Sequence, residues 1–60
     1  MPRMPQPLFN YVAYLSKMSV HSYARGANDH VFEFPDGGRV VISQRLFRQY
    51  DRELNLHRAG

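Results

Sequence analysis

The chain has 60 residues, of which 43% are hydrophobic and 22% are charged, with a formal net charge of +3 and no cysteine. This length allows one compact domain, which we expect over residues 8–60, and it leaves little room to enclose a ligand cavity of about 300 Å³. No apolar stretch approaches the roughly 20 residues that a membrane crossing requires. A chain without cysteine has no disulfide or thiolate chemistry, so we expect a cytoplasmic protein.

The first segment is rich in proline. Residues 1–7 contain Pro2, Pro5 and Pro7, and each proline fixes φ and disfavours helix in the residue before it, which predicts an extended arm. The residues that follow permit two interpretations. Their apolar positions recur at helical spacing, but they also alternate as in a strand. We favour a helix over residues 8–18, with an apolar stripe formed by Leu8, Tyr11, Val12, Leu15 and Met18.

The middle of the chain has the composition of strands separated by turns. Residues 19–25 are short, polar and compatible with a strand, and residues 25–29 supply the Gly, Asn and Asp of a turn. Residues 30–43 give the clearest signal, because runs of β-branched and aromatic residues flank Pro35–Gly38. Proline presets φ for a turn and glycine provides the positive φ of a following bulge, so this stretch predicts a β-hairpin.

The last segment predicts an amphipathic helix over residues 44–58. Ser43 can cap this helix, because its side-chain oxygen can accept a hydrogen bond from a free backbone N–H of the first turn. Helix and hairpin then each present one apolar face, and the face of the hairpin includes Phe32 and Phe34. We expect these faces to meet in one core containing Val40, Ile42, Leu46, Phe47, Tyr50 and Leu54.

Together these elements predict an α+β fold with an N-terminal helix, a small antiparallel sheet and a C-terminal helix across one face of the sheet. If residues 8–18 form a strand, the fold has three strands and one helix.

The excess positive charge lies in the C-terminal part of the chain. Residues 1–38 contain three cationic and three anionic side chains, whereas residues 39–60 contain five arginines and two acids. Arginine pairs bidentately with phosphate or carboxylate groups. Arg45, Arg48 and Arg52 share one face of the expected helix. Arginine and asparagine also recognise guanine and adenine edges in DNA, and Asn55 continues this face.

Aromatic residues are the second candidate feature, since the chain has four Phe, four Tyr and no Trp. Most of them have the positions of core residues, but Tyr11 and Tyr14 are less clearly inside. Tyr and Arg are frequent anchors of protein interfaces. The residues that we expect to bind a partner are therefore Tyr11, Tyr14, Arg39, Arg45, Arg48, Arg52 and Asn55.

Catalytic patterns are missing from the sequence. His21, His30 and His57 do not have the spacing of metal ligands, and neither a nucleophile elbow nor a phosphate-binding loop occurs. We therefore expect no enzymatic activity, no catalytic residues, no metal and no cofactor.

Two hypotheses follow for function. The first is a protein-binding factor that acts stoichiometrically on a host macromolecular machine, like the small inhibitors that phages and mobile elements encode against host defence or transcription. The second is a DNA- or RNA-binding regulator that uses the arginine face of the C-terminal helix. We favour the first because a net charge of +3 provides few cations for phosphate contacts. The sequence leaves the oligomeric state open.

Overall fold

The computed structural model describes residues 3–59, and Met1, Pro2 and Gly60 lie outside the described residues. It has the expected α+β fold. Along the chain, one helix precedes a three-stranded antiparallel sheet and a second helix follows it. Neither helix in this part of the chain has the length and apolar character that crossing a membrane requires. The elements are α1 (Gln6–Met18), β1 (His21–Arg25), β2 (Asp29–Glu33), β3 (Arg39–Ser43) and α2 (Gln44–Ala59).

Residues 8–18 are helical, and α1 begins two residues before them, at Gln6. The Phe9 N–H donates to the carbonyl of Pro5 over 3.0 Å, which starts the helical ladder. Pro7 lies in the first turn, where backbone N–H groups have no partner within the helix, so its missing donor leaves no gap. The proline is therefore compatible with the helix that we favour for residues 8–18.

The three strands pair in the order β1-β2-β3, so the central strand contributes to two hairpins. The second hairpin has the expected turn. The Gly37 N–H donates to the Phe34 carbonyl over 3.0 Å, and the Phe34 N–H donates to the Gly38 carbonyl over 2.9 Å. Gly37 has a φ of 89°, a conformation that glycine adopts without a steric penalty. The turn therefore fixes the register between β2 and β3, in which Phe32 lies opposite Val40.

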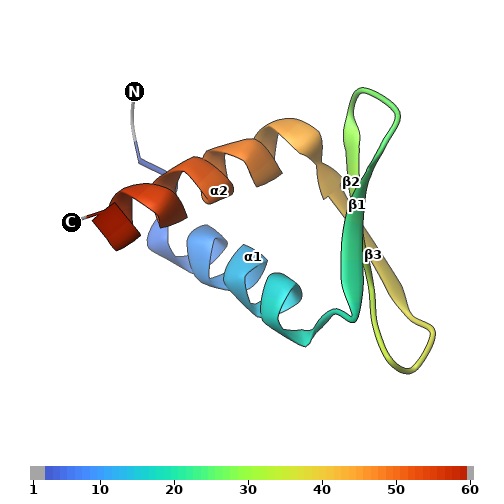
Figure 1. Ribbon diagram of the computed structural model, residues 1–60. Coiled ribbons are helices and arrows are strands. Elements are labelled where there is room, and N and C mark those ends of the chain that lie inside the picture. The colour runs from blue at the N-terminus through green and yellow to red at the C-terminus, as the bar shows by residue number, and fades with distance from the viewer. Residues whose placement is uncertain (1–2, 60) are drawn as a thin grey trace.

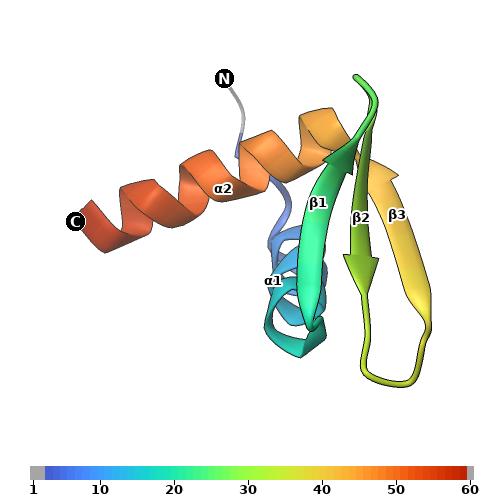
Figure 2. The same ribbon diagram turned by 45° about the vertical axis from the view of Figure 1, so that its right-hand side comes forward.

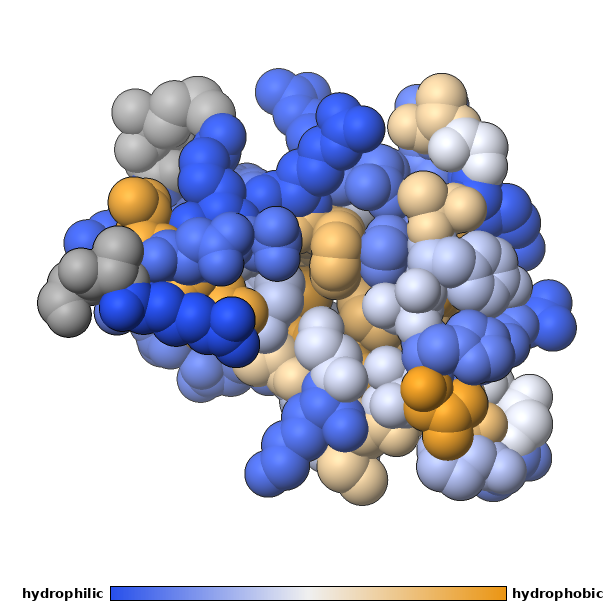
Figure 3. All heavy atoms as spheres, viewed as in Figure 1, coloured by the Kyte–Doolittle hydropathy of each residue, from blue (hydrophilic) through white to orange (hydrophobic). Residues whose placement is uncertain are grey.

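Both helices lie on one side of the sheet, and α2 leads away from the end of β3 (Figure 1). In the same view, hydrophilic side chains cover much of the outer side of α2 (Figure 3). The core therefore lies between the two helices and the inner face of the sheet. Its fully or nearly fully buried members are Met4, Val12, Leu15, Phe32 and Tyr50, and all six expected core residues belong to this cluster.

The structure differs from the sequence expectation at two core positions. Met4, from the expected arm, is only 5% exposed, and its N–H donates to Glu53 Oε2 over 2.9 Å. Val31 is fully buried although it lies on the face of β2 opposite Phe32. In the sheet register Val31 lies between Tyr23 of β1 and Val41 of β3. Side chains of directly paired residues on one face are close neighbours, so this face buries its central valine without a helix above it.

Candidate functional site

The arginine face of α2 is positioned by a cap at the end of β3. The Leu46 N–H donates to Ser43 Oγ over 3.0 Å, so Ser43 is the expected cap of the helix. The Gln44 N–H donates to the carbonyl of Asn28 over 2.7 Å, which joins the first turn of α2 to the turn between β1 and β2. These two bonds fix where α2 starts and therefore which of its sides faces solvent.

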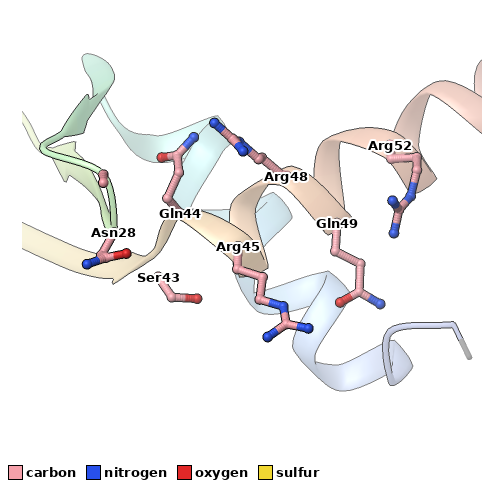
Figure 4. A pocket seen from close by; sticks show the side chains of 8 residues that line it. Asn28, Ser43, Gln44, Arg45, Arg48, Gln49 and Arg52 are labelled. Atoms are coloured by element: carbon pink, nitrogen blue, oxygen red, sulfur yellow. The ribbon is translucent and has the colours of Figure 1, made fainter. Parts of the chain in front are cut away.

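Arg45, Arg48 and Arg52 are exposed and lie along one surface depression of about 650 Å³. They project from successive turns of α2, and Asn28 lies beside the first turn (Figure 4). We call this surface the basic depression. The residues that line it are Ala27, Asn28, Ser43, Gln44, Arg45, Arg48, Gln49 and Arg52.

The positive charge of the basic depression is not neutralised. No carboxylate lines it, and within residues 3–59 its three arginines make no ion pair or hydrogen bond. The two arginines of the sheet, in contrast, each have an acidic partner. Arg25 pairs with Asp29 at 3.3 Å, and Arg39 Nε lies 3.4 Å from Glu33. An anionic group that enters the depression would therefore meet free guanidinium donors, which suit carboxylate and phosphate oxygens.

One residue of the basic depression is held from inside the fold. The Oε1 atom of Gln44 lies 2.9 Å from His30 Nδ1, and the His30 ring is buried against Phe47. His30 Nε2 is buried and has no hydrogen-bond partner among the residues that the structure describes. The carboxamide of Gln44 thus links the floor of the depression to the aromatic core, and it keeps the first turn of α2 in place.

The other expected binding residues lie elsewhere. Tyr11 and Tyr14 are exposed on α1, and Asn55 is exposed on α2 beyond the residues that line the basic depression. Arg39 lies at the opposite end of β3 from Ser43, where it contacts Glu33. The structure therefore brings together the three helical arginines and separates them from Arg39 and from the two tyrosines.

Part of the lining was not predicted. Asn28 comes from a turn, and Gln44 and Gln49 are ordinary polar helix residues, so no spacing in the sequence joins them. The hydrogen bond from the Gln44 N–H to the carbonyl of Asn28 joins that turn to the helix. This contact depends on the pairing of β2 with β3, in which Asp29 lies opposite Ser43, and that pairing is a feature of the folded chain.

The outer face of the sheet carries a second polar cluster, centred on Glu33. Its carboxylate accepts a hydrogen bond of 2.9 Å from the Tyr23 hydroxyl, contacts His21 Nε2 at 2.6 Å and pairs with Arg39. The hydrogen bond from Tyr23, followed by the contacts with His21 and Arg39, lowers the pKa of Glu33. The same hydrogen bond raises the pKa of Tyr23. The opposite charges of Glu33 and Arg39 compensate one another between β2 and β3.

No group of three or more His, Cys, Asp or Glu side chains within residues 3–59 is arranged to hold a metal ion. Comparison of the chain with protein-family models, with curated proteins and with solved structures finds no match.

Proposed function

We propose that this protein is a stoichiometric binding factor whose basic depression captures an acidic surface of a protein partner. The observation that carries the proposal is the group of three exposed arginines, which have no acidic partner within residues 3–59. Unpaired guanidinium groups on one helix face favour an anionic partner through charge-assisted hydrogen bonds. In this proposal the protein acts as a small inhibitor of a host macromolecular machine, of the kind that phages and mobile elements encode.

Binding is favoured over catalysis by the composition of the depression. Its lining contains arginines, amides, a serine and an alanine, but no carboxylate or histidine that would serve as a general base there. We place the action of the protein in the cytoplasm, because a chain without cysteine gains no stability from an oxidising compartment.

A protein partner is favoured by the surroundings of the arginines. Leu56 is 67% exposed and lies one turn after Arg52 on the same helix. An exposed leucine beside arginines suits the mixed apolar and charged character of a protein interface better than a row of phosphates. Arg25 and Arg39 are already paired with acids of the sheet, so they add little to a phosphate-binding footprint.

Nucleic acid is the second candidate, and one observation favours it. The exposed Asn28 places a side-chain amide beside the arginines of the basic depression. Amide and guanidinium groups together can recognise base edges as well as phosphates. Because phosphate contacts release counterions, this candidate predicts binding that weakens steeply with salt.

The test compares two triple variants with the same loss of charge. Arg45→Gln, Arg48→Gln and Arg52→Gln remove the arginines of the depression, whereas Arg3→Gln, Lys17→Gln and Arg58→Gln remove three exposed cations that lie outside it. Both variants should fold, because surface substitutions usually change stability by less than about 0.5 kcal/mol. The probes are a fluorescent acidic peptide and a fluorescent DNA duplex of random sequence, each titrated at several salt concentrations.

We expect the control variant to bind the acidic peptide like the parent protein, and the depression variant to lose this binding. Tighter binding to the duplex, with a steep log-linear salt dependence that only the depression variant loses, would favour the nucleic-acid candidate instead. Equal binding of both probes by both triple variants would remove the basic depression from consideration. Tyr11 and Tyr14 would then be the next surface to test.

A further inference from the structure

The strand β3 forms an open edge of the sheet. It pairs with β2 on one side, and Figure 2 shows neither helix beyond its other side. An edge strand presents unpaired backbone N–H and C=O groups, which form a template for another strand.

The register identifies the groups that point outward. Hydrogen bonds of an antiparallel pair alternate along the strands. Bonds are present at both ends of this pair, between Phe34 and Gly38 and between Gln44 and Asn28, and the register between them is continuous. Counting inward from either end directs the backbone groups of Val40 and Ile42 toward β2. The backbone groups of Arg39, Val41 and Ser43 therefore face away from the sheet.

The sequence of this edge gives it little protection against pairing. Natural edges are commonly blunted by proline, lysine or a bulge, whereas β3 has three consecutive β-branched residues, Val40, Val41 and Ile42, in an unbroken register. The Val41 side chain is 43% exposed, although its neighbour Val31 in the same row is fully buried. On the outer face of the sheet, the row formed by Tyr23, Val31 and Val41 therefore ends at an exposed apolar side chain.

We infer that β3 pairs antiparallel with β3 of a second copy of this chain, about a twofold axis at Val41. The outward groups of Val41 then exchange hydrogen bonds with those of Val41 in the second copy, and each Ser43 N–H reaches the carbonyl of Arg39 in the other copy. The valine row continues across the axis from one sheet into the other. The two sheets form one continuous sheet.

Charge and chain size both favour a second copy as the occupant of this edge. In the twofold arrangement Arg39 of each copy lies opposite the neutral Ser43 of the other, so no like charges are directly opposed. The other edge strand, β1, has no β-branched residue and carries a charged side chain at Arg25. A chain of 60 residues without cysteine also has little core of its own, and association is one way in which small domains gain stability.

The first test is the mass of the protein in solution. We expect sedimentation equilibrium to show a monomer that becomes a dimer between about 10 μM and about 1 mM, because a contact limited to one strand is small and therefore weak. Val41→Lys should abolish the dimer, and the matched control Val20→Lys, at another exposed valine, should retain it. A monomeric mass throughout this range, or a dimer that Val41→Lys leaves unchanged, would overturn the inference.

The second test remains informative if Val41→Lys fails to fold. Directly opposed residues of this kind have Cα atoms about 5.5 Å apart, which is within the range of about 4.4–6.8 Å for a disulfide. Because the chain has no cysteine, Val41→Cys introduces a single thiol. Under mild oxidation it should form a covalent dimer on the order of tenfold faster than Val20→Cys, since the pairing raises the effective concentration of the thiol. Equal rates would contradict the pairing.

Discussion

His30 of β2 lies flat against Phe47 of α2, with ring centroids 3.6 Å apart and ring planes 6° from parallel. Phe32 meets both rings edge-on, at 5.2 Å from His30 and 5.9 Å from Phe47. These three rings form the main aromatic contact between the sheet and α2. Since edge-to-face and stacked rings add to the energy of burial, this contact should contribute strongly to the stability of the fold.

Phe47→Ala should therefore destabilise the protein by about 3 kcal/mol. This is near the lower end of the range for burying Phe, because Phe47 is half-buried. The free energy of unfolding from urea denaturation measures the change. Tyr14→Ala, at an exposed aromatic residue of α1, is the control and should have little effect. If Phe47→Ala unfolds at the same urea concentration as the parent, the aromatic contact does not support the fold.

Met4→Ala should destabilise the protein by about 2 kcal/mol, because Met4 belongs to the buried core and its removal leaves a cavity. Thermal unfolding followed by circular dichroism measures the loss. The neighbouring exposed residue gives the control, Arg3→Ala, which should melt like the parent. A melting temperature that Met4→Ala leaves unchanged would mean that residues 3–5 do not pack on the core in solution.

Gly37→Val should destabilise the protein by about 1 kcal/mol or more, because Gly37 has a positive φ that a β-branched residue adopts only under strain. Gly38→Ala is the comparison. Its Cβ would lie 2.9 Å from Asp36 Oδ1, the end of a flexible side chain that can move away, so the change should be smaller. Urea denaturation of both variants gives the order, and a larger effect at Gly38 would contradict this account of the turn.

Glu33→Gln should weaken the dependence of stability on pH in both acid and alkali. The pKa of Glu33 is lowered from 4.5, chiefly by the hydrogen bond from Tyr23, so its stabilisation is present above that value and is lost as the pH falls through the folded pKa. The pKa of Tyr23 is raised from 10.0, chiefly by the same bond, so its stabilisation is present below that value and is lost as the pH rises through the folded pKa.

The direct measurement is an NMR titration of the Tyr23 ring. In Glu33→Gln the pKa of Tyr23 should move down toward its ordinary value, because the negative charge beside the hydroxyl is gone. The exposed residues Tyr11 and Tyr14 of α1 serve as spectral references for the assignment. An unchanged titration of Tyr23 would show that the hydrogen bond to Glu33 is not formed in solution.

The sequence predicted the elements whose signals are local. Pro35–Gly38 specifies its own turn, and Ser43 caps a helix that follows it directly, so hairpin and helix were both predicted correctly. Residues 8–18 fitted two periodicities, and the helix that we favoured is confirmed. The choice between helix and strand depends on packing, because Val12 and Leu15 are buried only when they share one face of a helix.

Of the candidate site, the sequence predicted only the residues that lie on a single helix, α2. Arg45, Arg48 and Arg52 share a face because of helical spacing alone, and they do line one depression. Arg39 was grouped with them on charge alone, but the length of β3 separates it from them and Glu33 pairs with it. The burial of Met4 was not predicted, because its packing partners and the Glu53 carboxylate that its N–H contacts lie far along the chain, Glu53 by 49 positions.

β3 ends at Ser43 and α2 begins at Gln44, so no linker residue separates the open sheet edge from the basic depression. A hinge needs residues that can change φ and ψ, and here the cap of Ser43 and the contact of Gln44 with His30 restrain both sides of the junction. The edge and the depression should therefore reorient as one rigid body on the nanosecond timescale. Backbone order parameters should stay uniformly high from Val40 to Arg52. A change in the twist of β3 should therefore move the residues that contact a ligand in the basic depression.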